Sequence, residues 1–222
     1  MINFPILSSL ILLPSIGALF LFFNKSNNEN NLTVKYVALF TSLVNFVLSI
    51  YLWISFDQTT SEFQFVEDRI WIENLINYKV GVDGISILFI ILTTFITPLC
   101  IISINNSIKN RLGEFLIAVL IMESFMIGVF CSLDLVVFYL FFEAGLIPMF
   151  LIIGIWGGSR RVYSAFKFFL YTLLGSVLML IAIISIYWIT GTTDVTKLYE
   201  SGIDVKYQNL LWLAFFSSFA VK

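Results

Sequence analysis

Six long apolar stretches follow one another along this chain, and they decide what it can fold into. A transmembrane helix needs about 20 mostly apolar residues, because each residue adds about 1.5 Å and the hydrocarbon core is about 30 Å thick. A seventh stretch begins near Gln208 and is still apolar at Lys222. The sequence predicts an all-α, polytopic transmembrane helix bundle in a single domain. It has six complete spans and the start of a seventh, at about residues 2–23, 34–56, 85–104, 112–131, 133–156, 162–189 and 208–222.

The composition agrees with a membrane protein and excludes several classes of function. Of the residues, 59% are hydrophobic and only 12% charged, whereas soluble domains carry about 25% charged residues. The net charge of -2 provides no basic surface for nucleic acid. With no histidine, the chain has neither a Ser/His/Asp triad nor an imidazole metal site. Cys100 and Cys131 lie in apolar runs without CxxC spacing, so no metal site is predicted.

The charged residues between the spans predict the orientation of the chain in the membrane. Because positively charged loops stay inside, the N-terminus is expected outside. The longer stretches 57–84 and 191–207 then lie outside, and the first is expected to form a short hairpin or an interfacial segment. The loops expected inside carry Lys25, Lys35, Lys109, Arg111, Arg160 and Arg161, and those expected outside carry Arg69, Lys79, Lys197 and Lys206.

Four charged residues fall inside the predicted spans: Glu123, Glu143, Lys167 and Lys222. A charge near the middle of a bilayer costs at least about 2.5–3.5 kcal/mol, so each needs a partner, a wet cavity or a function. Glu143 and Lys222 are both expected about 15 Å deep. Glu123 is expected at a similar depth, either as part of the same site or as a neutral acid bonded to a neighbouring backbone. Lys167 is nearer the inner surface, where its side chain can snorkel.

Two local features lie close to these charges. Pro148 cannot donate a hydrogen bond to the carbonyl of Ala144, and Gly145 is expected to make room for another partner there. A stripe of small and polar residues follows Lys167 on the sixth span. It either lets helices approach closely or forms a hydroxyl path for protons, and it consists of Tyr171, Thr172, Gly175 and Ser176.

Several motifs together resemble a known family. They read Phe-Glu-Ala-Gly-Leu-Ile-Pro-Met at 142–149, Gly-Ile-Trp-Gly-Gly at 154–158 and Ala-Phe-Lys-Phe-Phe-Leu-Tyr-Thr-Leu-Leu-Gly-Ser at 165–176. This run resembles the antiporter-like membrane subunits of respiratory complex I, of the NADH dehydrogenase subunit 4 (NuoM) type. Residues 81–86 and 219–222 are similar to the same family, whereas the first two spans carry little of its signal.

The resemblance implies a proton-translocating subunit with about fourteen helices. It implies that Glu143 on the fifth helix pairs with Lys222 on a broken seventh helix, and that Lys167 contributes to a hydrophilic axis. Glu123 is the fourth candidate for proton translocation. Because the chain has about half the length of the family, residues 1–222 are expected to be the N-terminal part of a longer subunit. That part is a fragment, one exon product or half of a split subunit.

The resemblance also assigns cofactors and partners. The chain has no nicotinamide fingerprint, flavin site or Fe–S cysteine set. NADH, FMN, the Fe–S clusters and the quinone are therefore expected on other subunits of NADH:ubiquinone oxidoreductase. The expected partners are other membrane-arm subunits, the lipid bilayer and the missing C-terminal half. The expected location is the mitochondrial inner membrane or, alternatively, a bacterial inner membrane, with the N-terminus on the intermembrane-space or periplasmic side. Two other functions stay open: a subunit of a multisubunit Na+/H+ antiporter, and a structural membrane scaffold.

Overall fold

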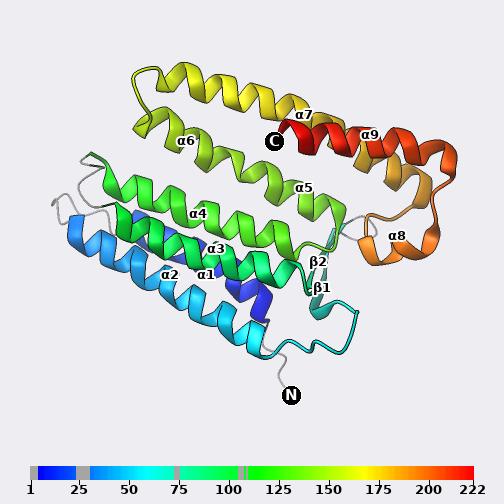
Figure 1. The fold of residues 1–222 in the computed structure, drawn as a ribbon, viewed down its shortest axis with the longest axis horizontal. Coiled ribbons are helices and arrows are strands. Elements are labelled where there is room, and N and C mark those ends of the chain that lie inside the picture. The colour runs from blue at the N-terminus through cyan, green and yellow to red at the C-terminus, as the bar shows by residue number, and fades with distance from the viewer. Residues whose placement is uncertain (1–4, 24–30, 73–75, 105–107, 109) are drawn as a thin grey trace. The chain divides into compact units, whose positions relative to one another are not determined.

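The computed structural model describes residues 5–23, 31–72, 76–104, 108 and 110–222, and it divides into two compact units. Unit 1 comprises Met1–Glu67 and Val80–Cys131, and unit 2 comprises Asp68–Lys79 and Ser132–Lys222. Both units are built mainly from helices (Figure 1). Lys25 and Lys109, two of the basic residues that predict the orientation, lie outside the described residues.

Six helical segments in the described chain are long and apolar enough to cross a membrane, so the six complete spans are confirmed. They are Ile6–Phe23, Leu32–Ile54, Ser86–Ser103, Leu112–Cys131, Leu135–Trp156 and Arg161–Thr190. The stretch expected to open a seventh span forms helix α9 (Val205–Val221), which has 17 residues. It begins before Gln208, because the Asp204 carboxylate accepts a hydrogen bond from the backbone N–H of Lys206 at 3.2 Å.

Unit 1 contains four helices that pack against one another: α1 (Ile6–Phe23), α2 (Asn31–Ile54), α3 (Ser86–Ser103) and α4 (Leu112–Cys131) (Figure 1). Glu67 fixes the start of α1, where its carboxylate accepts hydrogen bonds from the backbone N–H groups of Leu7 and Ser8 at 2.9 and 3.3 Å. A carboxylate suits this position, because the N-terminus of a helix carries a partial positive charge. The fully buried apolar side chains of the unit include Leu7, Leu10, Leu52, Ile90, Ile101, Leu116, Leu120 and Ile127.

The expected hairpin is present between α2 and α3. Strands β1 (Gln64–Ile72) and β2 (Ile76–Val82) form a two-stranded sheet. The boundary between the two units crosses both strands. The chain is thus mostly helical as predicted, with one small sheet in a stretch that was expected outside the membrane.

Unit 2 contains α5 (Leu135–Ala144), α6 (Leu146–Trp156), α7 (Arg161–Thr190), α8 (Val195–Ser201) and α9. The long helix α7 packs against both α6 and α9. It ends at Gly191, whose φ of 73° is a left-handed conformation that glycine adopts without strain. Buried Ala182, Ile186 and Leu211 form the apolar core between α7 and α9.

The fifth predicted span is interrupted at Gly145, which separates α5 from α6. Pro148 lies in the first turn of α6 and has no N–H for the carbonyl of Ala144, so the interruption is explained by the proline. A Cβ atom at Gly145 would come no closer than 3.7 Å to any neighbour. Local crowding therefore does not require a glycine at this position.

A group of polar residues, here called the polar clamp, joins three segments of unit 2: Lys79, Asp134, Thr193, Asp194 and Thr196. Asp134 caps α5, because its carboxylate accepts from the N–H groups of Val136 and Val137 at 2.8 and 3.3 Å. Its other oxygen accepts from the Thr193 hydroxyl at 2.6 Å. Asp134 is only 2% exposed, so this cap lies in the interior of the unit.

Asp194 provides the second half of the polar clamp. It caps α8 through the N–H of Thr196 at 3.0 Å and forms an ion pair with Lys79 at 2.7 Å. Burial opposes ionisation of Asp194, but hydrogen bonds from Lys79 and Thr196 outweigh it and hold its pKa below the ordinary value. Helix α8 itself was not predicted within the stretch 191–207.

Candidate functional site

The structure brings together Glu143 and Lys222, the two charges expected deepest in the membrane. Nζ of Lys222 lies 3.6 Å from Oε1 of Glu143, and the two side chains are 19% and 18% exposed. Nζ also donates a hydrogen bond to the backbone carbonyl of Phe142 at 2.9 Å. A side-chain partner for a backbone carbonyl was expected at Ala144, and the structure places it two residues earlier.

One aromatic ring lies against the ammonium group of Lys222, and two further rings pack on that ring. Nζ of Lys222 lies 3.0 Å from the ring centroid of Phe142, a cation–π contact. Phe142 stacks on Phe138 with 5.5 Å between ring centroids, and Phe219 meets Phe142 edge-on at 5.9 Å. Because the two side chains are only 19% and 18% exposed, the Coulomb attraction between Lys222 and Glu143 is screened less than it would be in water.

The charged groups of Glu143 and Lys222 lie close together, but one carboxylate oxygen of Glu143 accepts no hydrogen bond from the described residues. Oε1 of Glu143 is buried and, among the described residues, accepts no hydrogen bond. The ammonium faces it at 3.6 Å, which is beyond a normal hydrogen bond. Chemically, this arrangement can hold, release and rebind a proton.

Two residues that were not singled out as functional, Tyr139 and Ser218, place hydroxyl groups one helical turn from the pair. Tyr139 lies one turn before Glu143 on α5, and its phenol forms a hydrogen bond with the hydroxyl of Ser176 on α7. Ser218 lies one turn before Lys222 on α9, and its buried hydroxyl has no partner among the described residues. The sequence signal for them is polar residues one helical turn from a charged residue in an apolar helix.

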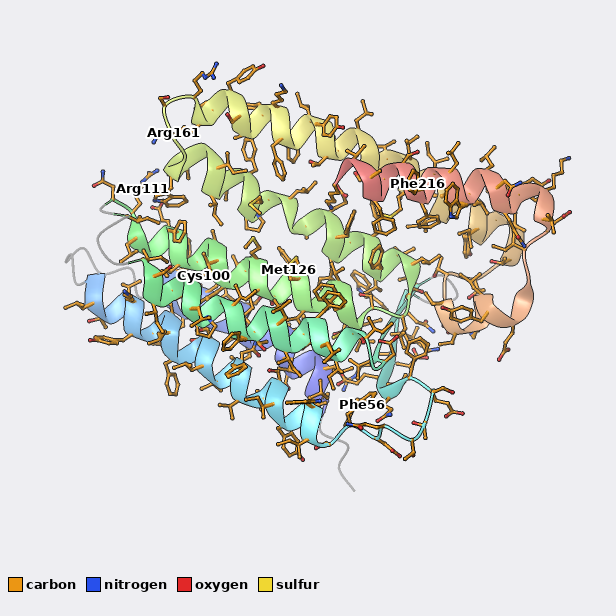
Figure 2. The ribbon with its side chains drawn as sticks, in the orientation of Figure 1. Phe56, Cys100, Arg111, Met126, Arg161 and Phe216 are labelled. Atoms are coloured by element: carbon orange, nitrogen blue, oxygen red, sulfur yellow. The ribbon has the colours of Figure 1, made fainter. Side chains whose placement is uncertain are left out.

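Gly175 allows α9 to approach α7 closely enough to place Lys222. A Cβ atom at Gly175 would lie 2.7 and 2.8 Å from Cγ1 and Cβ of Val221, the residue before Lys222. Real Cβ atoms essentially never come so close to other heavy atoms. Figure 2 shows the side chains of α9, with Phe216 labelled, along α7. Close helix approach, one of the two uses expected for the small-residue stripe, is therefore found at this position.

We expect Gly175→Ala to reduce the proton translocation that the motif resemblance implies by at least about threefold, because displacing a positioned group by about 1 Å costs up to about 10²-fold. The added methyl group would push Val221, and with it Lys222, away from Glu143. Proton uptake by membrane vesicles, normalised to the assembled amount of the protein, measures the effect. Gly154→Ala is the matched control, since its Cβ would meet Ala165 at an ordinary 3.5 Å. Equal activities of the two variants would contradict this role of Gly175.

Lys167 lies apart from the pair on α7. It is exposed, and its Nζ lies 6.0 Å from the ring centroid of Tyr163, one turn nearer the start of the helix. This direction agrees with snorkelling. Along α7, Lys167 precedes Gly175 by eight residues, or about 12 Å. In the part of the chain that the structure describes, the contact of Lys167 thus involves Tyr163 and neither member of the Glu143–Lys222 pair.

Glu123 belongs to unit 1, and its hydrogen-bond partner differs from the backbone group that was considered for it. It is 2% exposed and accepts a hydrogen bond at Oε1 from Nδ2 of Asn45 on α2, at 2.8 Å. The partner is thus a side-chain amide and not a backbone group. In the part of the chain that the structure describes, no three His, Cys, Asp or Glu side chains come together in a way that could hold a metal ion.

Comparisons with known proteins agree with the motif analysis. Residues 132–222 match the family described as NADH:quinone oxidoreductase/Mrp antiporter, TM. Over 218 residues, the chain is 49% identical to NADH-ubiquinone oxidoreductase chain 4 of Marchantia polymorpha, covering 97% of this chain and 44% of that protein. It is 55% identical to NADH-quinone oxidoreductase subunit M of Rhodobacter capsulatus over 201 residues, covering 85% of this chain and 39% of that protein. The chain therefore spans less than half the length of these relatives.

The fold is similar to a solved structure as well. A chain of respiratory complex I from Thermus thermophilus with bound NADH superposes with a TM-score of 0.82 at 26% identity, covering 96% of this chain and 43% of that chain. A chain of an archaeal membrane-bound sulfane sulfur reductase shares the fold, with a TM-score of 0.76. The resemblance found from the motifs is confirmed: this multi-pass membrane chain is similar to the chain 4 (subunit M) proteins of the NADH-ubiquinone and NADH-quinone oxidoreductases.

Proposed function

We propose that the chain is part of a proton-translocating subunit in the membrane arm of an NADH:quinone oxidoreductase. The observation that carries the proposal is the Glu143–Lys222 pair, which lies among aromatic rings in apolar helices. The similarity to chain 4 and subunit M proteins supports the same function. The protein then acts in an inner membrane, mitochondrial or bacterial, with its N-terminus outside, beside other membrane-arm subunits.

The pair would exchange a proton in two states. While Lys222 is charged and close, its attraction favours an ionised Glu143 carboxylate. When Lys222 loses its proton or moves away, the poorly solvated carboxylate takes up a proton instead. Moving one charge against about 150–200 mV requires roughly 3.5–4.6 kcal/mol. Separating an ion pair in surroundings of low polarity involves free energies of that size.

The driving force would come from redox chemistry elsewhere. We propose that other subunits bind NADH, FMN, the Fe–S clusters and the quinone, and that this chain responds to their reactions through its charges. The roles expected for Lys167 and Glu123 in the path stay predictions.

Replacement of Lys222 tests the proposal directly. We expect Lys222→Met to lower the number of protons moved per NADH oxidised by at least about tenfold, since a positioned proton-transfer group typically contributes about 10²–10⁴-fold. The variant leaves the Glu143 carboxylate without its cation. The measurement is acidification of inverted membrane vesicles during NADH oxidation, in membranes containing the full complex.

Lys197→Met is the matched control, because Lys197 is exposed on the short helix α8. It should translocate protons as the unmodified protein does. Lys222→Arg, which keeps the charge, should retain part of the activity. Unchanged proton stoichiometry in assembled Lys222→Met would contradict the proposal.

A subunit of a multisubunit Na+/H+ antiporter is the alternative function. It is favoured by the family description, which joins NADH:quinone oxidoreductases with Mrp antiporters. The two functions differ in the process that drives proton translocation across the membrane. Sodium-dependent proton flux in vesicles that lack any NADH dehydrogenase would establish the antiporter, whereas flux that requires NADH oxidation would exclude it as the main activity.

A further inference from the structure

Two buried polar side chains meet inside unit 1, and each has one oxygen atom without a partner. Asn45 is 0% exposed and Glu123 is 2% exposed. Nδ2 of Asn45 donates to Oε1 of Glu123 at 2.8 Å. Oδ1 of Asn45 and Oε2 of Glu123 are buried and have no hydrogen-bond partner among the described residues. Two acceptors cannot satisfy each other unless one of them carries a proton.

The helices around Glu123 provide no charge to balance an ionised carboxylate. Helices α1 and α3, which pack against α4, contain no charged residue. Helix α2 contains only Lys35, ten residues or about 15 Å before Asn45. On α4 itself the other charged residue is Glu114, which pairs with Arg111 at 3.5 Å. Arg111 precedes Glu123 by twelve residues, or about 18 Å.

Neighbouring polar groups in unit 1 are paired from helix to helix in the same way. Ser49 on α2 and Thr94 on α3 share a hydrogen bond at 2.7 Å. Ser15 on α1 donates to Ser124 on α4 at 2.8 Å. These pairs are neutral. In an apolar interior, neutral hydrogen bonds hold helices together, whereas an unpaired charge is strongly disfavoured.

We propose that Glu123 is a carboxylic acid that keeps its proton and shares it with Asn45. The acid would donate from Oε2 to Oδ1 of Asn45 and accept from Nδ2 at Oε1, so that two parallel hydrogen bonds join α2 to α4. No proton is lost or gained in forming this acid–amide pair. Glu123 then serves as a proton-holding link between helices, separate from the Glu143–Lys222 pair.

Infrared spectroscopy of the assembled protein in membranes tests the protonation. Ordinary carboxyl groups have pKa values of about 4 and are ionised at about pH 8, so a carbonyl band of protonated acid at that pH reports a buried neutral acid. We expect the band in the unmodified protein and its loss in Glu123→Gln. Glu114→Gln is the matched control on the same helix and should leave the band unchanged. Absence of the band from the unmodified protein, or a difference spectrum between it and Glu123→Gln that lacks the band, would overturn the proposal.

A second measurement tests the pairing independently of the spectrum. Glutamine can keep both hydrogen bonds to Asn45, so the assembled amount of Glu123→Gln should stay within about twofold of normal. Glu123→Leu removes both bonds and leaves Asn45 unpaired, so its assembled amount should fall at least about fivefold. Equal assembly of the two variants would refute the acid–amide pair.

Discussion

Glu143→Gln is expected to lower proton translocation by at least about tenfold while the complex still assembles, because a group that gains and loses a proton contributes about 10²–10⁴-fold. Glutamine has nearly the shape of glutamate but cannot take up a proton. Lys222 would keep its hydrogen bond to the carbonyl of Phe142 and its place over the Phe142 ring. It would lose its counter-charge 3.6 Å away. The measurement is the number of protons moved per NADH oxidised in vesicles containing the full complex.

Glu200→Gln is a suitable control for this experiment, because Glu200 is exposed on α8. It removes one carboxylate from unit 2 without touching the Glu143–Lys222 pair and should pump normally. If Glu143→Gln assembles and pumps at the normal stoichiometry, the proton-translocating role is refuted. That outcome would favour the structural scaffold instead.

The spans could be predicted from sequence because their signal is contained in each segment alone. A run of about 20 apolar residues bounded by charged loops leaves few alternatives to a transmembrane helix. Ends of helices were predicted less well. The start of α9 at Val205, before Gln208, and the existence of α8 both depend on caps by Asp204 and Asp194. An aspartate two residues before its bonded N–H is a sequence signal for such a cap.

The candidate site was only partly predictable, for a different physical reason. Glu143 and Lys222 stood out because charges in apolar helices are costly wherever the neighbours are. The partners of such charges depend on which helices pack together, and this is not contained in one segment. The link between Asn45 and Glu123 is an example. Its signal on α2 is a fully buried polar stripe at three- and four-residue spacing, formed by Ser42, Asn45 and Ser49.

Helix α5 carries Glu143, and Asp134 of the polar clamp caps its start. The polar clamp therefore contributes both to the stability of the protein and to the position of the Glu143–Lys222 pair. Asp134→Ala is expected to destabilise the protein by about 2–4 kcal/mol. It removes the cap from two N–H groups and leaves the buried Thr193 hydroxyl without its acceptor. The expected loss of melting temperature is on the order of 5–10 °C. Differential scanning fluorimetry of the purified complex measures this change in melting temperature.

Asp204→Ala provides the matched comparison, since Asp204 caps α9 with one hydrogen bond of 3.2 Å at an exposed position. An exposed cap is worth about 1 kcal/mol, so this variant should lose only about 2–4 °C. If both variants have the same melting temperature, burial of the Asp134 cap adds nothing to the stability of the protein. If Asp134→Ala melts earlier, its remaining folded protein should also pump less. Helix α5 would then start without its fixed cap, and Glu143, nine residues further on, would no longer be held facing Lys222.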